Sequence, residues 1–279
     1  MHRYTKWTLL REILVWIYTI AVLSPFYLLI NVALNDKMQT YNTDGATPAQ
    51  NPSLASFAEV INNPSIGPKL FLGLVNSFTI TIVAVIGLVI FGSVTSYILV
   101  RRTNRLSKLA FYAVLGGIVV PLQLGTVPLY IGAKNLGLLG NTPGMGVIYM
   151  AMFMPLAVLL YSGFFRSLPV EYEEAAFIDG ASRFRTYTRI VFPLVAPATG
   201  TVAIMCGVII FNDFFTPLIF LAGSDAPTIG VVVYHYVQSY SAPWNDVFAV
   251  LILAVLPMVV MYAIFQKRFI QGFAGGIKS

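Results

Sequence analysis

The densest group of ionisable side chains in the sequence lies between Glu171 and Pro193. This stretch, EYEEAAFIDGASRFRTYTRIVFP, holds four acids and three arginines, whereas the runs on either side of it carry almost no charge. Carboxylate and guanidinium groups make charge-assisted hydrogen bonds and ion pairs, and they keep a segment in water. We therefore expect a water-facing segment that a partner can bind.

Local signals in this segment predict two short helices around a bend. Pro169 can open the first helix, and the acids fall in its first turn, where the helix dipole favours negative charge. Gly180 can take the left-handed conformation that ends a helix. Ser182 can cap the next helix, and Pro193 lies where that helix should stop.

A second set of polar side chains lies inside apolar runs. Asn212 and Asp213 are the strongest candidates for lining a polar path, followed by Gln123 and Asn76. The alternative is that such groups hold helices together, which is the commoner role for residues such as Gln123 and Asn76. For Asn212 and Asp213 the two interpretations stand about even.

Other chemistry is poorly supported. The end of the chain, Gly272–Ser279, approaches a phosphate-binding loop, but Ile277 replaces the second glycine and no helix follows. The histidines are only His2 and His235, and Cys206 is the single cysteine, so metal ligation has no basis. We interpret Cys206 as a packing residue and His235 as an interfacial or packing residue. No motif points to a catalytic pair, and we expect no cofactor or metal on this chain.

The composition predicts an all-α polytopic membrane protein. With 57% hydrophobic and 10% charged residues, 279 residues in a soluble protein would have too little polar surface to cover themselves. Several uncharged runs have about 20 residues or more, which is the length a helix needs to cross a bilayer. We expect residues 1–279 to form one transmembrane domain of six helices, with a loop at 166–194 between the fourth and fifth. The predicted spans are residues 13–34, 70–100, 109–133, 145–165, 195–222 and 247–266.

The first three predicted spans have features of their own, and one further short helix is expected outside the spans. The first span is read as uncleaved, because a signal peptide would have a shorter apolar core and a small-residue cleavage site. The run 70–100 exceeds the bilayer thickness, so this helix must tilt or its outer end must leave the lipid. Pro121 and Pro128 interrupt the third span, which suggests a helix buried in a bundle. A short amphipathic helix is expected around Val231–Val237.

The orientation follows from the basic residues. With both termini in the cytoplasm, 14 of the 17 Lys and Arg residues fall in cytoplasmic segments and 3 in outer ones. The segment 166–194 then faces the cytoplasm. The net charge of +6 is explained by this topology and not by a nucleic-acid partner.

The segment also resembles a known family. Permease subunits of bacterial ABC importers carry a cytoplasmic loop with E-A-A, three residues, G, nine residues, I, two residues and P. At ordinary residue usage, six fixed matches arise by chance on the order of once in ten million positions. The residues that fill the pattern here are Glu174, Ala175, Ala176, Gly180, Ile190 and Pro193.

Within this family, the sequence is most similar to the carbohydrate branch, in particular to the second permease of maltose-type importers. The run Asp179-Gly180-Ala181 favours sugar over peptide or metal importers. The chain departs from the family at Phe192, where Leu is common, and at Phe211, where Trp is usual. The resemblance extends through residues 128–144, 163–169, 211–221 and 266–279.

The resemblance implies a type I ABC importer permease in the cytoplasmic membrane of a bacterium. Its expected partners are a second permease in a heterodimer, two ATP-binding subunits, an extracytoplasmic sugar-binding protein and membrane lipid. ATP and Mg belong to the ATP-binding subunits. The residues expected to couple this chain to them are Glu174, Ala175, Ala176, Asp179, Gly180, Ala181, Ile190 and Pro193.

A sugar path would use hydrogen bonds to hydroxyl groups and stacking on aromatic rings. Phe211, Phe214 and Phe215 therefore join the polar candidates, although in maltose-type systems the partner permease supplies most sugar contacts. Three alternatives stay open: a related permease for glycerol phosphate or another polar solute, an ion-coupled secondary transporter, and an intramembrane enzyme. An ion-coupled transporter would need several intramembrane ionisable groups, and a phosphate carrier would favour basic residues within the spans.

Overall fold

A computed structural model of the chain describes residues 6–42, 45–239 and 243–275. Every regular element among these residues is a helix, and none is a strand. The chain divides into two compact units, residues 1–71 with 232–257 and residues 72–231 with 258–279. The all-helical fold is confirmed. Residues 276–279, which complete the sequence resembling a phosphate-binding loop, lie outside the described part.

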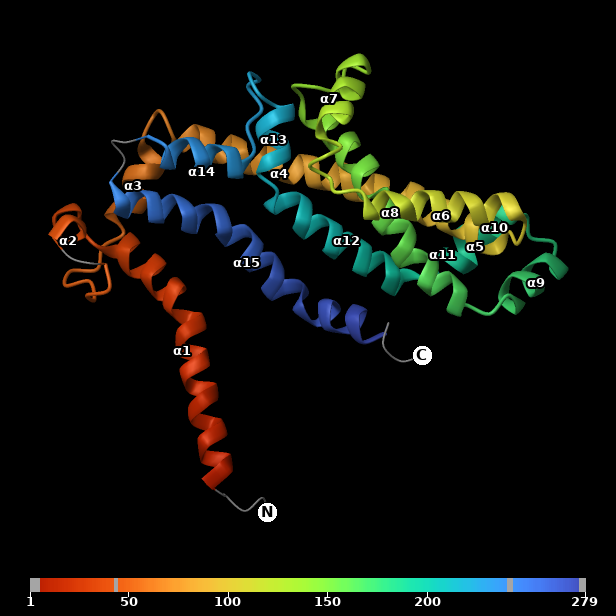
Figure 1. Ribbon diagram of the computed structural model, residues 1–279, viewed down its shortest axis with the longest axis horizontal. Coiled ribbons are helices and arrows are strands. Elements are labelled where there is room, and N and C mark those ends of the chain that lie inside the picture. The colour runs from red at the N-terminus through yellow and green to blue at the C-terminus, as the bar shows by residue number, and fades with distance from the viewer. Residues whose placement is uncertain (1–5, 43–44, 240–242, 276–279) are drawn as a thin grey trace. The chain divides into compact units, whose positions relative to one another are not determined.

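The larger unit is built around helix α8. This helix packs against α5, α6 and α12 (Figure 1), and it contributes the fully buried side chains of Tyr149, Tyr161 and Phe165 to the core. The elements of the unit are most of α4 (Gly67–Gly87), the π-helical turn η1 (Leu88–Gly92), α5 (Ser93–Arg101), α6 (Arg105–Val119), α7 (Thr126–Asn135), α8 (Thr142–Ser167), α9 (Glu171–Ile178), α10 (Arg183–Thr186), the π-helical turn η2 (Tyr187–Val191), α11 (Phe192–Leu194), α12 (Ala196–Asn212) and α13 (Phe215–Phe220), together with the start of α14 (Ile229–Val237) and the part of α15 (Trp244–Gly275) that follows Pro257.

Close packing between α4 and α8 depends on Gly146. A Cβ at this position would lie 2.6 Å from Cγ1 of Val83 and 3.3 Å from the carbonyl oxygen of Ile80. Small residues let two membrane helices approach this closely. The contact therefore has room for glycine and for no other residue without a shift of α4.

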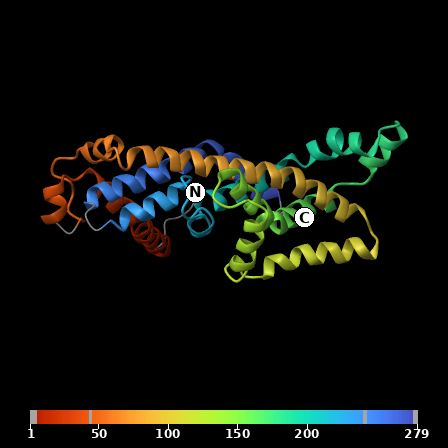
Figure 2. The ribbon, with the colours of Figure 1, turned by 90° about the horizontal axis from the view of Figure 1, so that it is seen from above.

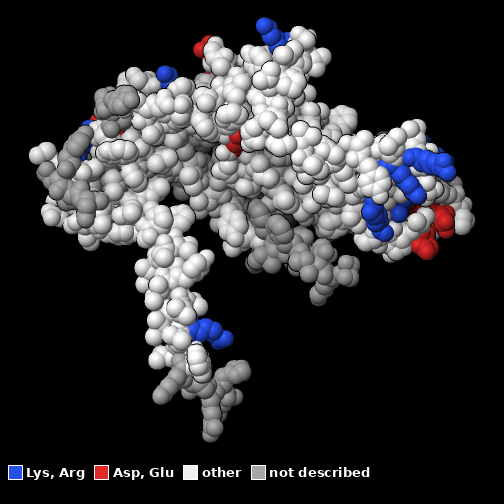
Figure 3. Space-filling view, in the orientation of Figure 1, with Lys and Arg blue, Asp and Glu red and all other residues white. Residues whose placement is uncertain are grey.

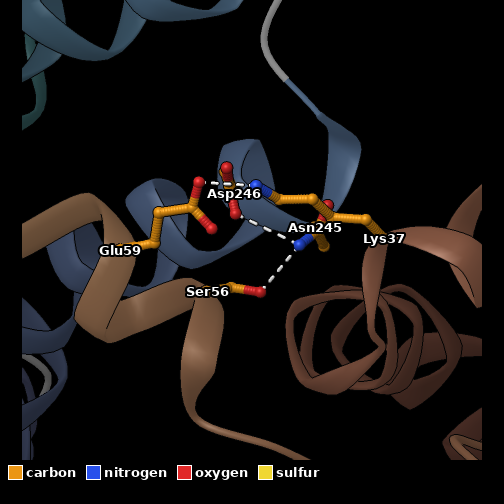
Figure 4. A network of polar contacts seen from close by, with 5 residues as sticks. All are labelled: Lys37, Ser56, Glu59, Asn245 and Asp246. Carbon is orange, nitrogen blue, oxygen red and sulfur yellow. Dashed lines mark hydrogen bonds and ion pairs between the residues drawn. The ribbon is translucent and has the colours of Figure 1, made fainter. Parts of the chain in front are cut away.

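The smaller unit contains α1 (Lys6–Leu34), α2 (Lys37–Asn42) and α3 (Ala55–Asn62), together with parts of α14 (Ile229–Val237) and α15 (Trp244–Gly275). A polar network joins the start of α15 to α3 (Figure 4). The amide of Asn245 donates hydrogen bonds to Ser56 Oγ at 2.8 Å and to Asp246 at 3.1 Å. Lys37 forms an exposed ion pair with Glu59 nearby.

By length and composition, four helices of the described chain could cross a membrane, and a fifth crossing arises if one bent pair counts as a single span. The unbroken run Gly67–Arg101 has 35 residues. At 1.5 Å per residue this helix is about 50 Å long, well beyond a hydrocarbon core of about 30 Å. This helix is therefore longer than a bilayer core is thick, and its tilt or exit from the lipid stays a prediction.

Two predicted spans are broken. The third is split, because α6 ends at Val119 just before Pro121, and α7 turns away from the line of α6 (Figure 2). Pro128 lies in the first turn of α7, where its missing N–H costs nothing. The fifth ends at Asn212 and restarts as α13. The helix expected near residues 231–237 is present as α14.

Candidate functional site

The charged segment forms the predicted pair of helices. Helix α9 ends at Ile178, and Gly180, two residues further on, has a φ of +78°, in the left-handed region. The amide of Ala181 donates to the carbonyl of Ala176 at 2.9 Å, and that of Gly180 donates to Phe177 at 3.1 Å. This pair of bonds is a Schellman motif, which satisfies the carbonyls at a helix end. The predicted left-handed conformation of Gly180 after the first helix is confirmed.

The second helix also follows the prediction. The Ser182 hydroxyl caps α10 by accepting a hydrogen bond from the amide of Arg185 at 3.4 Å. Helical structure continues through η2 and α11 to Leu194, one residue past Pro193. The chain then bends by 71° into α12. The segment is therefore an elbow joined to a long apolar helix.

Most of this elbow is open to solvent. Glu174, Ala175, Asp179, Gly180 and Pro193 are exposed, and Ala181 and Ile190 are half-buried. Ala176 differs, because it is buried against the rest of the unit. In Figure 3, basic and acidic side chains gather over the end of the larger unit that holds α9 and α10.

Two large apolar side chains flank the bend in this charged surface. Ile178 is 87% exposed and Phe184 is 78% exposed. Prominent apolar side chains surrounded by charge are typical of a surface that a partner protein covers. The elbow thus exposes both apolar and charged side chains around its bend.

One buried acid of this segment was not singled out from the sequence. Glu173, beside the expected Glu174, is buried and forms an ion pair with Arg101, with Nε 2.6 Å from Oε1. Its other oxygen accepts a hydrogen bond from the Tyr97 hydroxyl at 2.7 Å. Arg101 also donates to the carbonyl of Leu168 at 3.0 Å. A usable signal was the spacing of Glu173 and Ala176, since residues three apart share one helix face.

A small cavity with a few polar side chains in a mainly apolar lining lies at the break between α12 and α13. Its volume is about 210 Å³, below the range of about 300–1,000 Å³ that holds a complete small ligand. Three of the expected path residues border it, namely Gln123, Asp213 and Phe215. Gln123 and Phe215 are exposed, and within the described part of the chain the Gln123 amide makes no side-chain hydrogen bond.

The carboxylate of Asp213 is already engaged. One oxygen accepts the amide hydrogen of Phe215 at 3.0 Å, and the other accepts the hydroxyl hydrogen of Tyr149 at 2.9 Å and that of Thr216. These bonds cap α13 and tie the break to α8. The geometry favours the interpretation that Asp213 holds helices together.

The remaining path candidates lie elsewhere. Asn76 is buried and donates to the carbonyl of Pro227 at 2.9 Å, so it joins two segments. The Asn212 amide donates to the carbonyl of Val208 in its own helix. Phe211 is buried against Phe78, with ring centroids 5.0 Å apart, and Phe214 is half-buried. The small cavity does not bring these four together with Gln123.

A larger groove of about 800 Å³ is lined by α4, α12 and the middle of α15 around Met258–Tyr262, and Phe211 and Asn212 are among its lining residues. Its other lining residues are almost all apolar, so it suits lipid or another apolar helix rather than a polar solute. Cys206 is fully buried in the core, which confirms a packing role. Across the described residues, no three His, Cys, Asp or Glu side chains come together as a metal site.

Comparisons with known proteins place the chain in a family. Residues 6–275 match the family described as "Binding-protein-dependent transport system inner membrane component". The melibiose/raffinose/stachyose import permease MelC of Bacillus subtilis strain 168 is 35% identical over 254 residues, 90% of each chain. The diacetylchitobiose uptake permease NgcG of Streptomyces coelicolor is 31% identical, over 79% of this chain and 72% of that protein. The trehalose/maltose permease MalG of Thermococcus litoralis is 30% identical over 80% of each.

A solved structure has the same fold. In the crystal structure of a bacterial ABC transporter involved in the import of the acidic polysaccharide alginate, one chain matches with a TM-score of 0.84 at 17% identity. The match covers 96% of this chain and 100% of that one. Since the family match spans nearly the whole sequence, this multi-pass membrane protein belongs to the binding-protein-dependent transport system inner membrane components, the permease subunits of ABC importers, which are not themselves enzymes.

Proposed function

We propose that this chain is a permease subunit of an ATP-driven importer of a neutral oligosaccharide. The relatives reported above are named for oligosaccharides, from raffinose to diacetylchitobiose and maltose. The residues around the small cavity agree with a neutral solute, because they include an acid and no basic side chain. A phosphate ester such as glycerol phosphate, the main alternative, would be repelled there.

The proposed topology has six crossings and both termini in the cytoplasm of a bacterial cell, with residues 1–279 as one transmembrane domain. The third crossing would then be made by α6 and α7 together, since each alone is shorter than about 20 residues. The support for this orientation is the distribution of Lys and Arg. It puts α9 and α10 in the cytoplasm.

The elbow would dock into a cytoplasmic ATP-binding subunit. The single observation that carries this proposal is the exposed α9, with its acids and Ile178, ending in a bend fixed by Gly180. Small Ala175 permits close approach, and Glu174 can accept hydrogen bonds or pair with a basic residue. Two ATP-binding subunits would hold ATP and Mg, and their closure would move α9.

The complete importer would further include a second permease and an extracytoplasmic sugar-binding protein. The cavity near Gln123 is too small for an oligosaccharide by itself. We therefore assign Gln123 and Phe215 as this chain's sugar contacts, with the rest of the site on the partner permease. Asp213 would shape the cavity without binding the sugar.

The test is reconstitution of the whole complex in proteoliposomes with its binding protein. Labelled raffinose, maltose, diacetylchitobiose and glycerol phosphate would be offered with and without ATP inside the vesicles. We expect ATP-dependent uptake of at least one neutral oligosaccharide and none of glycerol phosphate. Uptake driven by an ion gradient without ATP, or a preference for the phosphate ester, would overturn the proposal.

A further inference from the structure

Helix α5 presents a polar stripe to the elbow. Ser93, Tyr97 and Arg101 are spaced four apart, so they lie on one face of the helix. Each of the three makes a hydrogen bond to the segment that follows α8. No other element of the described chain has so many polar contacts to this segment.

The C-terminal end of the stripe, Tyr97 and Arg101, contacts α9, the first helix of the elbow. Arg101 forms a charge-assisted bond to one carboxylate oxygen of Glu173, and Tyr97 donates to the other. The Arg101 and Glu173 side chains are only 16% and 6% exposed. A buried ion pair loses its compensation when its partners separate, so it resists gradual sliding. Helix α9 and helix α5 are thereby fixed to each other.

The N-terminal end of the stripe, Ser93, contacts the second helical part of the elbow, at η2. The Ser93 and Tyr187 hydroxyl groups are 2.7 Å apart, and the Tyr187 ring lies 5.1 Å from that of Tyr97. Ser93 directly follows the π-helical turn η1, and Tyr187 begins η2. Such turns occur often at functional sites in membrane helices and elsewhere. Both arms of the elbow therefore rest on the same face of α5.

We propose that this stripe, with Glu173 as its key partner, transmits the movement of α9 to the long helix Gly67–Arg101. The inference rests on the proposed docking of the elbow to an ATP-binding subunit. Arg101 ends this helix, so a force on Glu173 acts at the end of a lever about 50 Å long. Without the ion pair, α9 can follow the ATPase while the spanning helix stays behind. Glu173 and Arg101 are positioning residues and touch neither ATP nor solute.

The first test is Glu173→Gln in the reconstituted importer. We expect ATP hydrolysis within twofold of the parent and uptake per ATP at least tenfold lower, with all subunits still assembled. The matched control is Glu59→Gln, which removes a carboxylate from the exposed ion pair with Lys37 in the other unit and should change neither rate. Unchanged uptake per ATP in Glu173→Gln would overturn the proposal.

A double variant separates transmission from simple stability. Removing both charges with Arg101→Met and Glu173→Gln leaves no uncompensated buried ion, so the melting temperature should return close to that of the parent. If the stripe transmits movement, uptake per ATP stays low despite the restored stability. Recovery of both quantities would show that Glu173 only stabilises the fold, and the proposal would fail.

A defect in docking between the elbow and the ATP-binding subunit would instead change how much of that subunit co-purifies. Replacing the exposed Glu174 with Gln should reduce the amount of ATP-binding subunit that co-purifies, whereas Glu173→Gln should leave it unchanged. If Glu174→Gln has no effect but Glu173→Gln still uncouples uptake, Glu174 is not part of the docking surface and the transmission stands. If Glu173→Gln itself releases the ATP-binding subunit, Glu173 belongs to the docking surface and the transmission proposal is overturned.

Discussion

Replacing Gly180 with valine should uncouple ATP hydrolysis from transport. Gly180 has a φ of +78°, and a Cβ placed on it meets no heavy atom within 4 Å. Steric crowding against the rest of the chain therefore contributes nothing. The whole cost comes from forcing a residue with a Cβ into the left-handed region.

The magnitude follows from this conformation. The left-handed region costs an L residue roughly 1–2 kcal/mol, and a β-branched residue is among the least tolerant. Such a change shifts a local equilibrium about 5–30-fold. The two hydrogen bonds that close the bend, from Gly180 and Ala181, depend on that backbone conformation. The angle between α9 and α10 then becomes variable, and a push on α9 is absorbed at the bend.

The assay compares uptake with ATP hydrolysis for Gly180→Asn, Gly180→Ala and Gly180→Val in proteoliposomes. Asparagine tolerates the left-handed conformation, so we expect a graded loss of uptake per ATP in that order, with the valine variant lowest. Subunit assembly and the melting temperature should change little, since the site lies on the surface. Normal transport by the valine variant, or equal damage by asparagine, would refute the reasoning.

Four other changes test the cavity and the packing. Gln123→Ala should lower sugar uptake severalfold with no loss of thermal stability. Asp213→Ala should instead cost about 1–3 kcal/mol of stability, because it leaves the Tyr149 hydroxyl without its acceptor. Thermal unfolding in detergent measures this cost. Gly146→Val should cost about 1–3 kcal/mol or more by overpacking, and unchanged melting would mean that α4 and α8 are not in close contact. Asn245→Ala should lower the melting temperature without altering uptake per ATP; a coupling defect there would contradict its assignment to the fold of the smaller unit.

The elbow was predictable because its chemistry is local. A left-handed glycine, a serine cap and a nearby proline act over a few residues, so the bend at Gly180 and the cap at Ser182 could be placed from sequence. The third span was not, because Pro121 can kink a helix or end it, and neighbouring helices decide which. Glu173 was missed for the same reason. Which of two adjacent acids turns inward depends on how α9 packs, and Arg101 looked from sequence like one more positive charge at a membrane boundary.

The polar residues of the apolar runs divide according to whether their hydrogen bonds are already made. In lipid an unpaired polar group is costly. A polar side chain in a membrane helix is therefore expected either to hydrogen-bond to another part of the protein or to contact a solute or water. Asn76 and Asp213 have their bonds made within the chain, and each ties its own part of the chain to another segment. Gln123 borders the small cavity with its amide unengaged by any other described side chain. Sequence alone cannot separate these cases, because all of them read as a polar residue among apolar ones. Gln123 has hydrogen-bonding capacity left over, so it is the residue that we propose as a contact for a sugar hydroxyl. Asp213, the only acid deep inside a predicted span, already accepts hydrogen bonds at both carboxylate oxygens.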